Sequence, residues 1–259
     1  MPSNDCDEDG DGGAETRLTI AISTLGARAG SITLPAPRSF VGYLILLQRP
    51  DAAPVLPARG DVSVVALDSL GLSKSRNAAL ERAKTPFLML ADDDTKLDLA
   101  GIETLLQAIE ADPSLSFITG ELAGRTRREG PLRLWNAGRT NSSELLLRLA
   151  PLRDADLHFD EHFGLGADHA MGEEFIFIAD ALAAGLKGLH VSVTVAQHPD
   201  QSTGERWSDP ALLTARRAVL GRVFGWKAPF IRLIYAWKHR RALVNSPGGV
   251  LGFLLGPSA

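Results

Sequence analysis

The chain of 259 residues has a single cysteine, Cys6, so no disulfide can form within it. This cysteine usage does not indicate an oxidising compartment. The sequence also lacks an uninterrupted apolar run near the ~18 residues that a membrane-spanning helix requires. It lacks a cationic segment followed by an apolar core, which is the pattern of a secretory signal. These absences predict a cytoplasmic protein.

Basic residues are missing at one end of the chain and acidic residues are almost missing at the other. Residues 1–16 contain no Lys or Arg, and 206–259 contain one acid, Asp209. The hydrophobic content of 45% and the charged content of 22% are typical of a soluble globular protein. We therefore expect an acidic flexible tail (1–16), a folded domain (17–205) and a basic, amphipathic helical extension (206–259).

Apolar segments alternate with helix signals through the first half of the domain. Short buried runs predict strands, and a capping residue before a 3.6-residue apolar period predicts a helix, as at Asp98. The predicted strands are 18–24, 41–47, Val62–Leu67, 87–90, 115–119, 145–149 and 189–195. This alternation predicts an α/β fold with a mostly parallel sheet flanked by helices.

A predicted helix that starts near residue 71 carries two cations and an amide in its first turn, Lys74, Arg76 and Asn77. The dipole and the free N–H groups of a helix N-terminus favour a bound anion, and cationic side chains add to that attraction. The helix therefore predicts a site for a phosphate or diphosphate.

Three aspartates, Asp92, Asp93 and Asp94, follow the apolar strand 87–90. Carboxylates at the carboxyl end of a strand are placed to hold a hard divalent cation. Alternate residues of an extended chain point to the same side, which would bring Asp92 and Asp94 together. The simpler alternative is a charged strand end at the surface. The helix just upstream favours the metal site.

Two further candidates lie downstream. Glu173 and Glu174 begin the predicted helix 172–185, where the dipole stabilises acids in any protein, but a carboxylate at a pocket mouth could also act as a general base. His198 follows the predicted strand 189–195, and its imidazole could join two carboxylates around Mn²⁺.

These motifs, in this order, resemble glycosyltransferase family 2, whose members have the GT-A fold. The resemblance covers roughly residues 17–205. The blocks that carry it are GLSKSRNAAL (71–80), LMLADDD (88–94), FDEHFGLGA (159–167), GEEFIFIADALAAG (172–185) and HPDQSTG (198–204). It implies that a sugar moves from a nucleotide-sugar to an acceptor hydroxyl, with inversion.

The resemblance also implies roles for single residues. Asp92 and Asp94 match the D-x-D aspartates that hold a divalent metal, Mn²⁺ or Mg²⁺, and the donor diphosphate. Arg76 matches the arginine that faces the donor. Glu174 matches the catalytic base of an acidic pair, and His198 matches a late histidine of the metal shell.

One block departs from the family pattern. Family members usually carry an Asp-rich turn after the second strand that recognises the nucleobase, often uracil. Residues 47–51 read LQRPD instead, so Gln48 or Asp51 would have to take this role. The nucleobase of the donor is therefore left open.

The basic extension, 206–259, has two interpretations. It holds two amphipathic segments, Pro210–Phe224 and 229–244. The slightly favoured interpretation is that these segments are ordinary helices that pack on the domain. The other is a contact with the inner face of a membrane through 206–244, which would suit a lipid-linked acceptor. The thick apolar face and the absence of a recognised binding module argue against nucleic acid.

The sequence as a whole predicts a glycosyltransferase of the hexosyltransferase type, with a glycan, polysaccharide or lipid-linked acceptor. Two alternatives stay open. A sugar-phosphate nucleotidyltransferase would need a Gly-rich triphosphate loop after the first strand, which residues 24–28 resemble only faintly. A non-catalytic nucleotide-binding member of the fold would also fit the unusual turn at 47–51.

Overall fold

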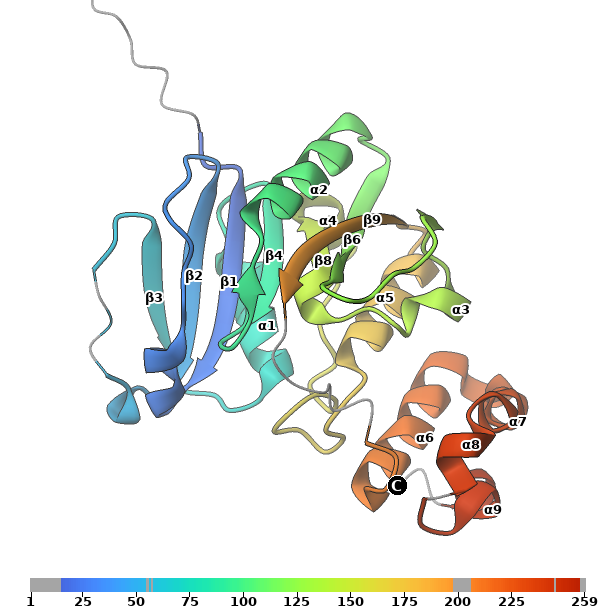
Figure 1. Cartoon of the computed structure of the whole chain (residues 1–259). Helices are drawn as coiled ribbons and strands as arrows, with labels where there is room; N and C mark the ends of the chain where they lie inside the picture. The colour runs from blue at the N-terminus through green and yellow to red at the C-terminus, as the bar shows by residue number, and fades with distance from the viewer. Residues whose placement is uncertain (1–14, 55, 57, 198–205, 245, 257–259) are drawn as a thin grey trace, which may run out of the picture.

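The computed structural model describes residues 15–54, 56, 58–197, 206–244 and 246–256. Its first half is a parallel sheet whose strands, from edge to centre, follow the order β3-β2-β1-β4 (Figure 1). The strands are β1 (Leu18–Leu25), β2 (Val41–Gln48), β3 (Val62–Leu67) and β4 (Phe87–Asp92). All four predicted strands are present. The chain leaves β1 on one side and returns on the other, which creates a switch point in the strand order, the usual place of a ligand site in such sheets.

The second half of the sheet is mixed. Strand β8 (Leu145–Arg148) inserts antiparallel between β4 and β6 (Leu115–Leu122), and β6 pairs in parallel with β9 (Lys187–Gln197). Two short strands, β5 (Lys96–Leu97) and β7 (Gly130–Pro131), pair antiparallel with β9. The prediction of a mostly parallel sheet is therefore confirmed for β1 to β4, but the direction of β8 was not foreseen.

Helices cover both faces of the sheet (Figure 1). On one face, α1 (Leu72–Arg82), α4 (Leu149–Asp154) and α5 (Glu173–Ala183) share a core with alternate strand residues such as Leu88 and Leu90. On the other face, α2 (Leu99–Ala111) packs on residues such as Met89. The Asp98 carboxylate caps α2 as predicted, because it accepts hydrogen bonds from the N–H groups of Ala100 and Gly101.

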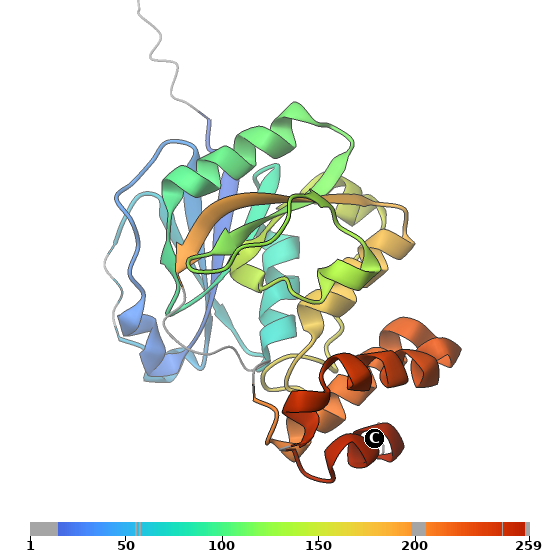
Figure 2. The same cartoon turned by 45° about the vertical axis from the view of Figure 1, so that its right-hand side comes forward.

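The C-terminal region forms a separate cluster of helices below the sheet (Figure 2). It contains α6 (Pro210–Phe224), α7 (Ala228–Lys238), α8 (Arg240–Val244) and α9 (Gly249–Leu255), and we call it the helical module. Its own core is built from Leu213, Leu220, Ala236, Leu243 and Phe253. Both predicted segments are helical, whereas α9 was not predicted. Among the described residues, no helix combines the length and the apolar character needed to cross a membrane.

Candidate active site

A cleft of about 1210 Å³ lies outside the carboxyl ends of β1, β2 and β4. Its other walls come from the first turn of α5, from the segment 125–141, and from the helical module through Trp207 and His239. A volume of this size exceeds the usual range of small-molecule pockets, about 300–1,000 Å³, so the cleft has room for a large ligand or for two smaller ones.

Arg76 is the central side chain of the cleft. Its guanidinium is only 2% exposed, and it reaches three carboxylates that come from two other elements. Nη1 donates to Glu173 Oε1 at 2.9 Å and to Glu174 Oε1 at 3.1 Å, and Nη2 lies 3.6 Å from Asp92 Oδ1. Burial alone would lower the pKa of Arg76, but these carboxylates outweigh it and raise the pKa. Arg76 therefore ties the start of α5 to the end of β4.

Glu174 is the carboxylate with the most perturbed protonation in the cleft. Its side chain is 16% exposed and lines the cleft at the first turn of α5. Burial, followed by the charge of neighbouring Glu173, raises the pKa of Glu174 to about 7, although Arg76 acts in the opposite direction. A general base works best when its pKa lies near the operating pH. The environment of Glu174 thus suits proton transfer at neutral pH.

The three aspartates do not continue the strand. Strand β4 ends at Asp92, and the following residues form a turn in which Thr95 N–H donates to Asp92 O at 3.1 Å. The premise that an extended chain aligns Asp92 with Asp94 is therefore wrong, because the chain reverses here. The turn still leaves all three carboxylates lining the cleft.

Asp93 is held by Thr24, near the end of β1, and by Arg28, which follows β1. Its carboxylate accepts from Thr24 Oγ1 at 2.9 Å and from Arg28 Nε at 2.9 Å, and it also contacts Arg28 Nη2. The same guanidinium lies 3.4 Å from Asp94 Oδ2. The hydrogen bond and the charge of Asp93 raise the pKa of Arg28. Asp93 thus fixes the turn to β1, while Asp92 faces Arg76.

The cleft offers hard oxygen ligands for a divalent cation in Asp92 and Asp94. Mg²⁺ is typically bound through one or two carboxylates plus substrate phosphates rather than by a closed protein cage. This donor set fits such a cation. Within the described parts of the chain, no group of three or more His, Cys, Asp and Glu side chains is arranged to hold a metal. His198, the third predicted ligand, lies outside the described residues.

The other predicted donor-binding residues of α1 face elsewhere. Asn77 donates to Phe159 O at 3.0 Å and accepts from Phe159 N–H at 2.7 Å, so its amide holds the loop before α5. Lys74 is exposed, and neither it nor Asn77 is among the described residues that line the cleft. Their predicted contact with the diphosphate gains no support from these positions.

The wall at the end of β2 is where a nucleobase was expected. Gln48 and Arg49 line the cleft, whereas Asp51 is exposed and is not among the described lining residues. Gln48 Nε2 donates to Gly71 O at 3.1 Å, which joins the end of β2 to the start of α1. Of the two residues considered for base recognition, the geometry favours Gln48.

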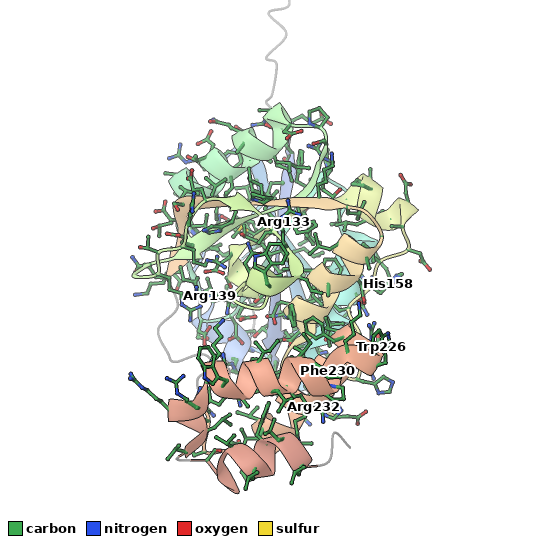
Figure 3. The ribbon with its side chains drawn as sticks, turned by 90° about the vertical axis from the view of Figure 1, so that its right-hand side faces the viewer. Arg133, Arg139, His158, Trp226, Phe230 and Arg232 are labelled. Atoms are coloured by element: carbon green, nitrogen blue, oxygen red, sulfur yellow. The ribbon has the colours of Figure 1, made fainter. Side chains whose placement is uncertain are left out.

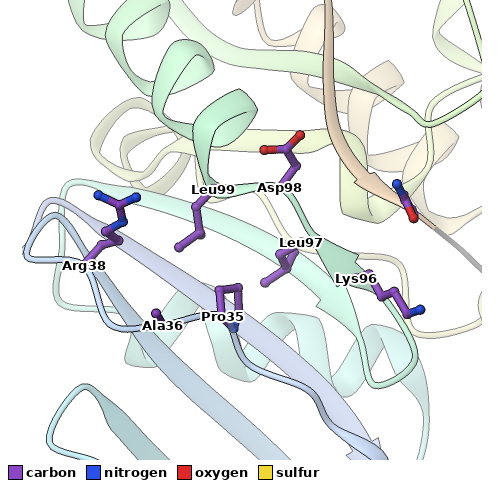
Figure 4. A pocket seen from close by; sticks show the side chains of 8 residues that line it. Pro35, Ala36, Arg38, Lys96, Leu97, Asp98 and Leu99 are labelled. Carbon is purple, nitrogen blue, oxygen red and sulfur yellow. The ribbon is translucent and has the colours of Figure 1, made fainter.

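A second hollow, of about 420 Å³, lies between the loop before β2 and the start of α2 (Figure 4). It is lined by Pro35, Ala36, Arg38, Lys96, Leu97, Asp98, Leu99 and Gln197. The one carboxylate in it, Asp98, already caps α2. We assign no chemistry to this hollow.

A comparison with known protein families matches a segment that supplies part of the cleft. The family model described as glycosyl transferase family 2 matches residues 51–163, which include α1, β4 and the three aspartates. This stretch belongs to glycosyltransferase family 2. A search of curated protein sequences gives no match to the chain.

Solved structures show that the fold of the chain is GT-A-like. The structure of S. aureus TarS 1–349 in complex with UDP-GlcNAc superposes with a TM-score of 0.58 at 15% identity, covering 93% of this chain and 76% of that one. The mannosyltransferase PcManGT from Pyrobaculum calidifontis, in complex with GDP-Man and Mn²⁺, gives 0.53 at 13% identity, with 84% and 65% covered. The chain spans 45% of a longer TarS structure.

Several lining residues of the cleft were not predicted from the sequence. Arg125, Arg127 and Arg139 belong to the poorly patterned segment 121–139, whose basic character was the one available signal. Arg127 Nη2 donates to the fully buried Glu144 Oε2 at 3.0 Å, which holds this wall to the sheet. Trp207 and His239 gave no signal, because only the docking of the helical module brings them to the cleft.

Proposed function

We propose that this protein transfers a sugar, of the hexose type, from a nucleotide-diphosphate sugar to an acceptor hydroxyl with inversion at the anomeric carbon. One observation carries the proposal. A single buried guanidinium, Arg76, joins Asp92 at the predicted diphosphate site to Glu174, the predicted base, inside one cleft. The two halves of a transfer site are therefore adjacent.

Glu174 is the group that accepts the proton of the acceptor hydroxyl. The freed oxygen forms a bond to the anomeric carbon while the bond from that carbon to the diphosphate oxygen breaks, and the bonding electrons leave with the nucleoside diphosphate. Arg76 holds the Glu174 carboxylate at 3.1 Å and thereby orients it. A base that is held in place lowers the entropic cost of the displacement.

The same cleft would hold the leaving diphosphate through Asp92 and Asp94. A divalent cation, Mn²⁺ or Mg²⁺, bound by these carboxylates and completed by His198, would supply positive charge that stabilises the departing diphosphate. Arg28 lies beside the same turn, 3.4 Å from Asp94. Its guanidinium fixes the turn and adds positive charge next to the proposed site.

Two of the structures described above support a nucleotide-sugar donor, since they contain UDP-GlcNAc and GDP-Man. In this chain the diphosphate would lie near Asp92 to Asp94, and the nucleobase would lie toward Gln48 and Arg49. The acceptor would approach Glu174 from the side of the helical module. We propose a glycan or lipid-linked acceptor, as in polysaccharide biosynthesis, at the cytoplasmic face of a membrane.

A thermal-shift panel tests the donor half of this proposal. Nucleoside diphosphates and nucleotide-sugars are added with and without Mn²⁺, and a matching donor at about 100 times its Kd should raise Tm by roughly 5–10 °C. Asp94→Ala should lose the Mn²⁺-dependent part of the shift, and Asp154→Ala, an exposed aspartate on α4, should keep it.

Three results would count against the proposal. No shift with any nucleotide removes the donor site altogether. Pyrophosphate release from a sugar phosphate and a nucleoside triphosphate favours a nucleotidyltransferase. Donor binding without transfer to any acceptor favours a non-catalytic member of the fold.

A further inference from the structure

Helix α7 carries a row of large apolar side chains that face solvent. Trp226, just before the helix, is 80% exposed, and Trp237, near its end, is 70% exposed. Between them Phe230, Leu233 and Ile234 are also exposed. Figure 3 shows Trp226 and Phe230 on this outer side of the molecule. Soluble monomers rarely leave such a continuous apolar patch uncovered unless it binds something.

The spacing of these residues makes the patch one continuous stripe. Each of the positions 226, 230, 233, 234 and 237 lies three or four residues from another of them, so they share one side of the helix. The opposite side of α7 buries Ala236 in the core of the module, and Ile231 and Tyr235 pack against the same core. The helix is therefore fixed in its rotation, and the stripe cannot turn inward without breaking that core.

Cations border the stripe at both ends. Lys227 Nζ lies 5.5 Å from the ring centre of Trp226, and the Arg240 guanidinium lies 5.2 Å from that of Trp237. Lys238 and Arg241 are exposed beside the latter. The one acid in residues 206–259 is Asp209, and its carboxylate caps α6 by accepting from Ala211 N–H. The module therefore presents positive charge that its own acids do not neutralise.

We propose that this face of α7 binds the surface of an anionic lipid bilayer, with the helix lying in the plane of the interface. An apolar stripe with tryptophans, flanked by Lys and Arg, has the composition of an interfacial helix. The cations reach anionic headgroups while the rings enter the boundary of the acyl region. This inference names the surface through which the proposed function would meet a membrane.

A second copy of the chain is the less favourable occupant. An isologous contact would place each stripe against its own copy, and the bordering cations would then face one another. With Asp209 the single acid in the module, there is no acidic rim to compensate this repulsion. An anionic bilayer instead supplies the opposite charge over the whole face.

The stripe ends next to the cleft. His239, two residues after Trp237, lines the cleft and stacks on Trp207 with ring centres 4.9 Å apart. Arg139, from the opposite cleft wall, lies on the same side of the molecule as Trp226 and Phe230 (Figure 3). A bilayer on this face would adjoin the cleft rim, so the head of a lipid-linked acceptor could reach Glu174.

Sedimentation with vesicles tests the proposal on the whole protein. Vesicles of phosphatidylcholine alone are compared with vesicles that also contain about one-third phosphatidylglycerol. We expect binding to the anionic vesicles and at least ~10-fold weaker binding in Trp226→Ala with Trp237→Ala, and in Lys238→Glu with Arg241→Glu. The matched controls are Val64→Ala, on the opposite edge of the sheet, and Arg82→Glu with Lys84→Glu, at the end of α1; they should bind like the wild type.

The remaining outcomes separate the alternatives. Failure of the wild type to bind anionic vesicles, or equal binding by the face variants and the controls, overturns the proposal. A concentration-dependent dimer in analytical ultracentrifugation that Trp226→Ala with Trp237→Ala abolishes also overturns it, in favour of a second copy. Donor-induced thermal shifts of the face variants should equal those of the wild type, so a failure here is distinct from a failure of the proposed function.

Discussion

The cleft and the outer face of α7 use charge in opposite ways. In the cleft, Arg76 and Arg28 are held by carboxylates at hydrogen-bonding distances. Beside the outer face of α7, by contrast, Lys238 at the end of α7 and Arg241 on α8 form no ion pair within the described residues. Paired and buried charges orient groups for a reaction, whereas unpaired surface charges attract a distant partner. A single substitution should therefore disturb the cleft strongly, whereas the attraction at the face of α7 depends on several residues together.

The largest effect should come from Glu174→Gln, which keeps the shape of the side chain and removes its basicity. Donor binding should stay close to that of the wild type, while transfer should fall by roughly 10²–10⁴-fold, the usual contribution of a general base. The measurement is steady-state sugar transfer together with donor-induced thermal shift. An enzyme with wild-type turnover would remove Glu174 from the mechanism.

Arg76→Met should be the most destabilising substitution in the cleft. It leaves Glu173, Glu174 and Asp92 without their shared cation, and breaking a buried ion pair in this way typically costs about 3–5 kcal/mol. Urea denaturation measures the loss in the free energy of unfolding.

Arg82→Met, on the exposed end of the same helix, is the control for Arg76→Met. It should change the free energy of unfolding by no more than about 0.5 kcal/mol. An equal loss in the free energy of unfolding for the two variants would show that the stability of the cleft does not depend on its paired charges. The cleft would then not differ from α7 in its use of charge.

Most strands could be predicted from the sequence because their burial dominates their pattern. Helix α6 and the partly exposed strand β3 have the predicted bounds, Pro210–Phe224 and Val62–Leu67, because an Asp-Pro start and a Val-rich, mostly apolar run are local signals. The direction of β8 is set by its pairing with β4 and β6, strands that lie far from it in the sequence. Local patterns carry no information about such a pairing.

The same distinction, between local patterns and contacts of distant segments, explains which parts of the candidate site could be predicted. The acids at 92–94 and 173–174 were predicted because each group follows or begins a recognisable element. Arg76 was predicted to face the donor, but its pairing with Glu174 was not, because the two residues lie 98 positions apart and meet only in the folded chain. Trp207 and His239 were missed for the same reason, since they reach the cleft through the packing of α6 on α5.

Gly172→Ala should weaken the packing of α6, the first helix of the helical module, on the start of α5 at the cleft. Gly172 has φ of 97°, and a Cβ there would lie 2.3 Å from Val219 Cγ2 on α6. We expect a loss of about 2–4 kcal/mol in the free energy of unfolding, part from the left-handed backbone and part from the clash.

Gly185→Ala is the matched control for Gly172→Ala, because its φ is 83° and nothing lies within 4 Å of the added Cβ, so it has the backbone strain without the clash. It should cost about 1–2 kcal/mol from the backbone alone. Combining Gly172→Ala with Val219→Ala should recover the difference between the two glycine variants. If both glycine variants cost the same, the packing of the helical module on α5 contributes little to stability.

The smallest effect concerns the pH profile and tests how closely the cleft charges are coupled. The raised pKa of Glu174, about 7, predicts that kcat/KM falls below that pH, because the base is then protonated. It also predicts that the free energy of unfolding declines as the pH rises from about 4.5 to about 7, since the folded state holds a proton that the unfolded chain releases. Both trends depend partly on the negative charge of Glu173.

Glu173→Gln removes that charge and leaves Arg76 next to Glu174. The acid limb of kcat/KM should therefore move to lower pH, because the carboxylate of Glu174 loses a repulsive neighbour and keeps its cation. The decline in the free energy of unfolding should still begin near pH 4.5, the pKa of Glu174 in the unfolded chain, but it should end at lower pH and be smaller. A limb that stays in place would mean that burial alone raises the pKa of Glu174. In that case the pKa of Glu174 would be set by the packing of many residues around it. The cleft would then resemble the outer face of α7, which depends on many weak contributions rather than on one charged pair.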